Sequence, residues 1–425
     1  MTSDDTARFD LGAVHRAEYS RVLAAVAATT RDLELAEESV PEAFAVALRS
    51  WPVQGVPDRP GAWLTTVARR RAIDVARREG RRARLELDAS HGPVRPDDDE
   101  GSDHDRLRLA FLTCHPSFTP APRIAMTLRF VFGLHTREIA RLLTMSESAV
   151  HKQVQRARAK VRDARIPLRF PPGSKVGERL PSVLDCLRLV FTEGYAATSG
   201  DDLIRTDLCR EAIELTREAV ATFPDDIGAR ALLSLELLQD ARRAARLDAT
   251  GAVVLLEHQD RGRWDRDTIS QALDLFDALL PVLEDEDLDP SARSLVLQAA
   301  IAAVHARAAT FDATDWVELL GHYDALLALT GSGAVALNRV VVVRRVVGTA
   351  AALADLDRID PTRVGRVHLY HAVRADLLDA TGDLEGARRA LDGAIEAAGT
   401  SPERALLEER QRMMSAASRA TITEL

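Results

Sequence analysis

Apolar residues recur at helical spacing through most of the chain, beginning with a segment between residues 8 and 84. Two stripes come first: one of Val14, Tyr19, Leu23 and Val26, and one of Leu35, Ala36, Val40, Ala43, Phe44 and Ala47. A third runs through GAWLTTVARRRAIDVARR, where the expected buried side consists of Trp63, Leu64, Val67, Ile73 and Val75. The pattern predicts a helical first domain.

The segment from 105 to 165 predicts a helix-turn-helix. An apolar helix ends at Gly133, and a short helix follows with Thr136 as its expected N-cap. Ser146 is placed to cap a longer helix whose inward positions are Val150, Val154, Ala157 and Val161. This spacing is typical of a DNA-binding helix pair.

Two interruptions divide the chain. Residues 85–104 are acidic, carry Gly and Pro, and show no helical period, which predicts a flexible linker. Prolines are expected to stop helices between Arg165 and Pro181. The predicted pieces are therefore 8–84, 105–165 and 178–425.

The third piece reads as a series of helix pairs. Its clearest repeat, HAVRADLLDATGDLEGARRALDGAIEAAG, has small and large residues at tetratricopeptide positions: Ala375, Leu378, Gly382, Ala387, Leu391 and Ala394. Such pairs stack into a curved solenoid with a concave surface. The expected fold class is all-α.

Composition supports this class, because aromatic residues are 4% of the chain and hydrophobic residues 46%. No apolar run approaches the roughly 20 residues that span a bilayer, and the polar first residues do not resemble a secretory signal. Cys114, Cys186 and Cys209 are far apart in sequence and predict neither a disulfide framework nor a zinc site. We expect a cytoplasmic protein with no metal, no cofactor and no membrane partner.

The net charge of −9 argues weakly against nucleic acid, but charge is segregated along the chain. Two basic blocks, 69–84 and 135–165, flank the acidic stretch 86–105. Two separated basic helices suggest two contacts with one polyanion.

The second helix of the helix-turn-helix carries the sharper nucleic-acid signal. The residues expected to face a major groove are Ser146, Glu147, Ser148, Ala149, His151, Lys152 and Gln153, and those expected on phosphates are Arg156, Arg158 and Lys160. The alternative is an ordinary helical hairpin. The basic second helix and its capped start favour DNA binding.

The first domain offers a second candidate. Outward arginines on the third helix, with Trp51 in the preceding loop, suit a single strand, since phosphates pair with arginine and unstacked bases need a stacking surface. The alternative for Trp51 and Trp63 is core packing, which we favour for Trp63. Glu34, Glu37, Glu38 and Glu42 form an acidic face that can dock a basic helix, or one that is simply solvated.

Polar residues also interrupt apolar helices of the third piece. They are Glu193, Tyr195, Arg242, Arg243, Arg246, Asp260, Arg261, Trp264, His305, Arg307 and Asn338. A buried network that locks the solenoid is the favoured interpretation, and a pocket for a ligand or partner is the alternative. The chain has no nucleophile elbow, Gly-rich phosphate loop or HExxH motif, so we do not expect an enzyme.

Taken in order, LAEESVPEAFAVAL, GAWLTTVARRRAIDVARRE and LRFVFGLHTREIARLLTMSESAVHKQVQRARAKVR resemble an RNA polymerase sigma factor of the extracytoplasmic-function type. The resemblance implies a sigma-2 domain at 8–84, which binds core RNA polymerase and opens the −10 element. It also implies a sigma-4 domain at 105–165, which reads the −35 element of promoter DNA. Arg71 stands where the family often has Asn, and Pro41 interrupts the acidic helix, so the −10 base preference and the shape of the polymerase contact stay open.

The resemblance also implies residue roles. The polymerase contacts would be Leu33, Glu37, Glu38 and Glu42. The −10 strand would meet Trp51, Trp63, Arg69, Arg70, Arg71, Asp74, Arg77 and Arg78. The helix from Ser146 to Arg158 would read the −35 duplex.

The remaining residues resemble the subgroup with a tetratricopeptide-like C-terminal extension, through LRLVFTEGYAATSGDDLIRTDLCREAIEL and LLEHQDRGRWDR. We expect this extension to contact the sigma domains and to regulate them, in either direction. The alternative is a helix-turn-helix regulator with a helical effector or scaffold domain.

Overall fold

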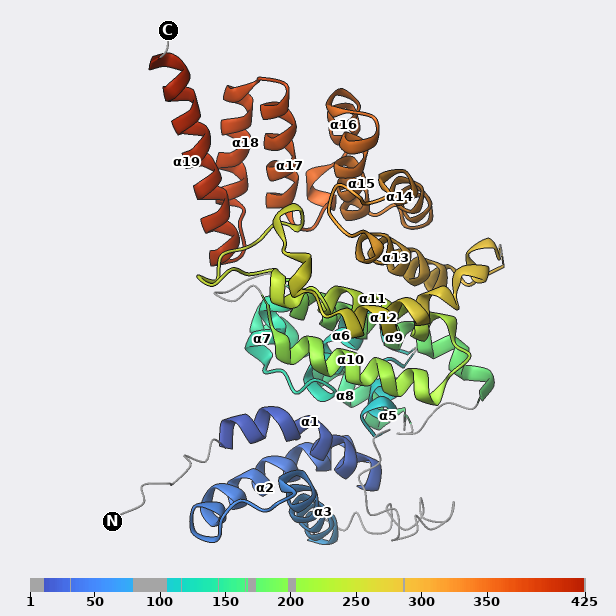
Figure 1. The fold of residues 1–425 in the computed structure, drawn as a ribbon. Coiled ribbons are helices and arrows are strands. Elements are labelled where there is room, and N and C mark those ends of the chain that lie inside the picture. Colours follow the sequence, from blue (N-terminus) through green and yellow to red (C-terminus); the bar gives the residue numbers. More distant parts are fainter. Residues whose placement is uncertain are drawn as a thin grey trace. The chain divides into compact units, whose positions relative to one another are not determined.

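Figure 1 shows a computed structural model of the chain, which describes residues 11–30, 32–78, 105–115, 117–143, 145–164, 166, 173–197, 204–285 and 287–423. Over these ranges there is no β-strand, and one isolated antiparallel bridge joins Leu247 and Val253. The predicted all-helical class is confirmed for the residues described. The predicted linker, 85–104, lies outside them.

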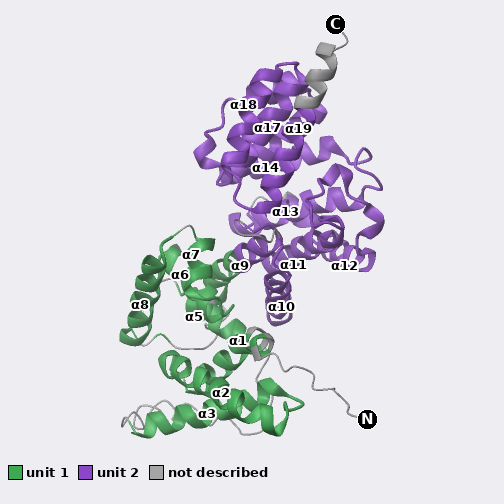
Figure 2. Cartoon of the chain, turned by 90° about the vertical axis from the view of Figure 1, so that its left-hand side faces the viewer, with its two compact units in different colours: residues 1–186 green, residues 187–425 purple. Residues whose placement is uncertain are grey.

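The chain divides into two compact units, residues 1–186 and 187–425 (Figure 2). The division falls within α9 (Gly173–Tyr195), which contains Pro181. The expectation that Pro181 stops a helix was therefore wrong. A proline removes one hydrogen bond to the carbonyl four residues earlier, and here that carbonyl belongs to the exposed Gly177, where water can replace the lost donor.

Unit 1 begins with α1 (Leu11–Thr30), α2 (Leu33–Gln54) and α3 (Pro60–Arg78), which pack on one another. Asp32 caps α2 by accepting hydrogen bonds from the backbone N–H groups of Glu34 and Leu35, at 3.0 and 3.1 Å. The buried side of α3 consists of Leu64, Ala68, Ala72 and Ala76. Ile73 is 42% exposed, so its predicted burial was wrong; the small alanines let α3 approach its neighbours closely instead.

The rest of unit 1 contains α5 (Asp105–Thr113), α6 (Pro120–Phe130), α7 (Thr136–Leu142) and α8 (Glu147–Asp163). Ser146 caps α8 as predicted, accepting from the N–H of Ala149 at 3.2 Å. Thr136 is the first residue of α7 rather than its cap. His135 precedes the helix, and its N–H donates to Glu138 at 2.9 Å, which closes the end of α7.

Unit 2 continues as successive packed helices. Their bounds are α10 (Thr206–Thr222), α11 (Ile227–Asp240), α12 (Arg266–Asp277), α13 (Pro290–Arg307), α14 (Trp316–Thr330), α15 (Gly333–Val346), α16 (Thr349–Leu356), α17 (Val367–Ala380), α18 (Leu384–Glu396) and α19 (Ser401–Thr423). Short 3-10 segments are η1 (Arg243–Ala245), η2 (Leu256–His258), η3 (Arg261–Arg263), η4 (Leu280–Glu284) and η5 (Pro361–Arg363).

The repeat expected near the C-terminus corresponds to α17 and α18, which pack side by side (Figure 1). Ala375 of α17 is buried against Leu391 and Ala394 of α18. Helix pairing is thus observed at this position. None of the described helices is long and apolar enough to cross a bilayer.

Candidate functional site

A polar strip runs along the exposed side of α8. Val150, Val154 and Ala157 are buried on the opposite side, where α8 packs on α6 and α7. The exposed residues are Ser146, Glu147, Ser148, His151, Lys152 and Arg156, with Ala149 and Gln153 half-buried beside them. The α8 strip, as we call these residues, therefore presents the predicted groove-facing side chains on one accessible surface.

Arg158 does not belong to the α8 strip. Its guanidinium lies 5.3 Å from the ring centroid of Phe130 and forms an ion pair with Glu37 of α2. One turn further along α8, Arg162 lies 3.7 Å from Glu34. The end of the helix-turn-helix is thus held against the acidic face of the first domain.

The acidic residues of α2 differ in accessibility. The Glu37 side chain is 11% exposed, and burial raises the pKa of its carboxyl although the nearby Arg158 and Arg129 lower it. Glu38 and Glu42 are exposed, and Glu42 accepts a hydrogen bond from Arg71 at 3.0 Å. Leu33 is buried, so it offers little surface to a partner in this arrangement.

Close packing between α1 and the turn after α6 accompanies the Arg158–Glu37 contact. Gly133 has φ +64°, and a Cβ atom there would lie 2.7 Å from the hydroxyl oxygen of Ser20. The rings of His15 and His135 stack at 6.3 Å between centroids. The two predicted nucleic-acid domains therefore share one interface within unit 1.

On α3, Arg70, Asp74, Arg77 and Arg78 are exposed, whereas Arg69 and Arg71 are half-buried. The position of Trp51 requires a correction. It lies in α2 rather than in a loop, is 3% exposed, and meets the half-buried Trp63 edge to face at 5.2 Å. Because α2 continues to Gln54, Trp51 is directed into the core, which is the packing alternative rather than the base-stacking one.

The cysteines form a contact that sequence separation concealed. The sulfur atoms of Cys114 and Cys186 lie 3.6 Å apart, and both are buried free thiols that form no disulfide. Hydrogen bonding between them lowers the pKa of Cys114 and raises that of Cys186. The first half of α9 is thereby packed against the end of α5.

The structure brings together some of the polar residues singled out in the third piece. Arg242, Arg261, Trp264 and His305 lie in one cluster, and Arg246 stacks on the Tyr195 ring at 3.7 Å. The others lie elsewhere: Arg243 pairs with Asp240, Arg307 pairs with Asp277, Asp260 caps η3, Glu193 is half-buried on α9, and Asn338 is exposed on α15. A single network that includes all eleven is not observed.

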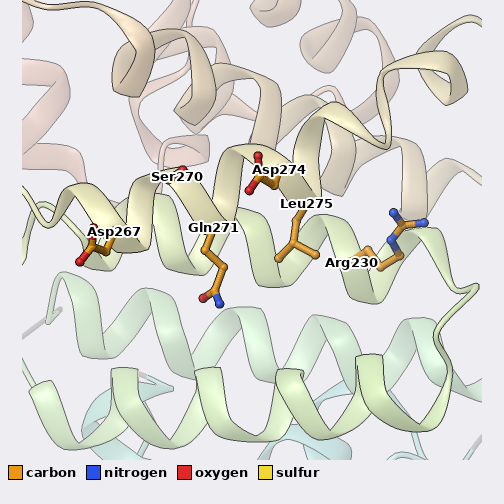
Figure 3. Close-up of a pocket in the computed structure, with 6 residues that line it drawn as sticks. All are labelled: Arg230, Asp267, Ser270, Gln271, Asp274 and Leu275. Carbon is orange, nitrogen blue, oxygen red and sulfur yellow. The ribbon is translucent and has the colours of Figure 1, made fainter.

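A surface pocket of about 580 Å³ lies between α11 and α12 (Figure 3). Its lining residues are Arg230, Asp267, Ser270, Gln271, Asp274 and Leu275. The two carboxylates are exposed, and Gln271 accepts a hydrogen bond from Arg217 of α10 at 3.4 Å. Over the described part of the chain, no group of three or more His, Cys, Asp or Glu side chains is arranged to hold a metal ion.

Comparisons with known proteins assign the parts of the chain. Residues 14–82 match the family Sigma-70 region 2, and residues 108–161 match Sigma-70, region 4. Residues 179–280 match a family of unknown function, DUF6596. The α2 face, the α3 arginines and the α8 strip thus fall within the two Sigma-70 regions.

Two relatives show how much of the chain is shared with other proteins. The uncharacterized protein R00370 of Rhizobium meliloti is 38% identical over 428 residues, which cover 99% of both chains. The probable ECF RNA polymerase sigma factor SigI of Mycobacterium tuberculosis is 34% identical over 149 residues, covering 33% of this chain and 50% of SigI. Its Sigma-70 regions 2 and 4 and the partial match to SigI support a sigma factor with a C-terminal extension, and the chain belongs to the same family as R00370.

Proposed function

We propose that the chain binds core RNA polymerase, opens the −10 element and reads the −35 element of its promoters, as an extracytoplasmic-function sigma factor would. The observation that carries the proposal is the α8 strip, because its exposed polar side chains follow a capped helix start inside Sigma-70 region 4. A helix placed in this way reads base edges from its N-terminal half. The protein would act in the bacterial cytoplasm, where the polymerase works.

The first domain would hold the other two contacts. The exposed Arg70, Arg77 and Arg78 of α3 supply cations for the phosphates of a parted −10 strand. Glu38 and Glu42 of α2 are accessible to a basic surface of the polymerase. Trp51 is buried, so base stacking by this residue would require α2 to rearrange.

The ion pair between Arg158 of α8 and Glu37 of α2 links the DNA-reading helix to the acidic face of the first domain. While this pair is intact, Arg158 is not available to a DNA phosphate, and Glu37 is not available to the polymerase. Engagement of the polymerase through α2 would release the end of α8. We propose that the extension, built of tetratricopeptide-like helix pairs, regulates this release.

The test is transcription with core polymerase and a promoter of defined −35 and −10 sequence. The double variant Lys152→Ala and Arg156→Ala removes two exposed cations of the α8 strip, and we expect a loss of about tenfold or more in transcript at matched salt. The control is Arg210→Ala, which removes an exposed cation of α10 in unit 2.

Two results would contradict the proposal. One is a purified chain that neither associates with core polymerase nor directs a defined start site. The other is an unchanged transcript level in the double variant. Duplex binding with no effect on polymerase would instead support the helix-turn-helix regulator.

A further inference from the structure

Two arginines of unit 2 flank one buried tryptophan without an acidic partner. Arg242 follows α11, and Arg261 begins η3. Their guanidinium carbons lie 5.2 and 4.5 Å from the ring centroid of Trp264, which is 3% exposed. With His305 of α13, these residues form what we call the arginine–tryptophan cluster.

Hydrogen bonding leaves several donors of this cluster unused. One Nη atom of Arg261 donates to the carbonyls of His305 and Ala308, at 2.6 and 2.5 Å. The other Nη atom and the indole N–H of Trp264 are buried donors that have no hydrogen-bond partner among the described residues, and the ring nitrogen Nδ1 of His305 is also buried without a partner there. Arg242 reaches one neutral acceptor, the Gln259 side chain, at 3.4 Å. Unused donors in a buried place are costly, so they indicate a missing acceptor.

The charged groups that shift the pKa values of this cluster are all cationic. Burial, followed by the charges of Arg242 and Arg261, lowers the pKa of His305 to about 4, so this imidazole is neutral near pH 7. Burial, followed by the charges of Arg242 and Arg266, lowers the pKa of Arg261. No ion pair to Arg242 or Arg261 occurs within the described ranges.

Other arginines of unit 2 are treated differently. Arg339 pairs with Asp324 and Asp355, and Arg374 lies 2.7 Å from Asp357. Arg261, by contrast, is 7% exposed and has no acidic partner among the residues that the structure describes. A buried cation beside a second, half-exposed cation is unfavourable unless an anion accompanies them. The arginine–tryptophan cluster therefore has an uncompensated positive charge that an anion would neutralise.

We propose that the arginine–tryptophan cluster binds an oxyanion, the carboxylate or phosphate group of a small molecule. Guanidinium groups present parallel N–H donors that match both of these anions. Arg242 is half-exposed, so the ligand reaches the cluster from its side, while Arg261 and Trp264 supply the buried donors. This site lies in the extension and is separate from the promoter contacts proposed above. It would let the extension bind a small molecule of its own.

Binding can be measured on the full-length chain without polymerase. The protein is dialysed into chloride buffer and titrated calorimetrically with sodium phosphate and, separately, sodium acetate, with sodium chloride at equal ionic strength as the reference. We expect saturable heat from at least one of the two anions. Phosphate alone or acetate alone would assign the group that the ligand carries.

Variants of Arg242 test the site, because Arg261 also holds the end of α13 through two carbonyls. Arg242→Gln removes one charge, and we expect the association constant to fall at least tenfold. Arg242→Lys keeps the charge and should lose less. The matched control, Arg374→Gln, removes an arginine that already has a carboxylate partner and should bind as the parent does. Saturable heat from neither anion, or equal binding by Arg242→Gln with native circular dichroism, would overturn the proposal.

Discussion

Glu236 makes the stability of unit 2 depend on pH. This residue lies in the middle of α11 and has no exposed surface. The Thr216 hydroxyl lies close to this carboxyl but donates to the carbonyl of Ala212. Neither carboxyl oxygen of Glu236 has a geometrically formed hydrogen bond among the described residues. Burial raises the pKa of Glu236 to about 8, an effect that outweighs the lowering by Thr216 and Arg217.

The sign of the effect follows from where the proton sits. In the unfolded chain the carboxyl ionises near its ordinary pKa of 4.5, whereas in the folded chain it stays protonated up to about pH 8. Unfolding between these values releases a proton, so the contribution of Glu236 to stability is most favourable below pH 4.5 and declines as pH rises to about 8. At pH 7.5 the lost stability is about 4 kcal/mol, against roughly 1 kcal/mol at pH 5.5.

The change that removes this dependence is Glu236→Gln, which keeps the shape and cannot ionise. We expect the variant to be more stable than the parent by up to about 4 kcal/mol at pH 7.5. This corresponds to about 10 °C in the midpoint of a unit of this size. The gain should shrink to roughly 1 kcal/mol at pH 5.5. Calorimetric scans at both pH values measure it.

The matched control is Glu385→Gln, a change at a side chain that is 86% exposed. We expect its free energy of unfolding to stay within about 0.5 kcal/mol of the parent's at both pH values. A Glu236→Gln variant that is destabilised, or that gains equally at pH 5.5 and 7.5, would refute the reasoning about a buried neutral acid.

Two further changes test the packing of unit 1. Gly133→Ala introduces a Cβ beside Ser20 at a positive φ, so we expect the free energy of unfolding to fall by about 1–2 kcal/mol. Fluorescence transfer between a label at position 49 of α2 and one at position 147 of α8 should also fall. The control is Gly177→Ala, at an exposed helical glycine with open space around it, which should change neither the distance between the labels nor the fold. Unchanged transfer in Gly133→Ala would show that the strain stays within the turn at Gly133. A chain ending at 166 should have a free energy of unfolding about 2 kcal/mol or more below that of a chain ending at 187, and so a lower midpoint, because it lacks the buried α9 residues that include Cys186. Equal midpoints would show that α9 adds nothing to unit 1.

The candidate site was predictable where it depends on helical periodicity. Ser146 caps α8, and Val150, Val154 and Ala157 face inward, because the neighbours that decide these positions lie within one or two turns. The same reasoning failed for Ile73 and Trp51. Either side of α3 satisfies a helical period, and only contact with α1 and α2 selects the alanine side.

The sequence by itself therefore determined the helical class, the helix-turn-helix and the residues of the α8 strip, since these depend on local spacing and capping. Contacts between distant segments were decided by the tertiary structure alone. Cys114 meets Cys186 across 72 residues, Arg158 finds Glu37 on another helix, and Arg242 and Arg261 converge on Trp264 without a carboxylate. The partner of a charged group or a thiol cannot be predicted from the sequence, because it depends on how the helices pack.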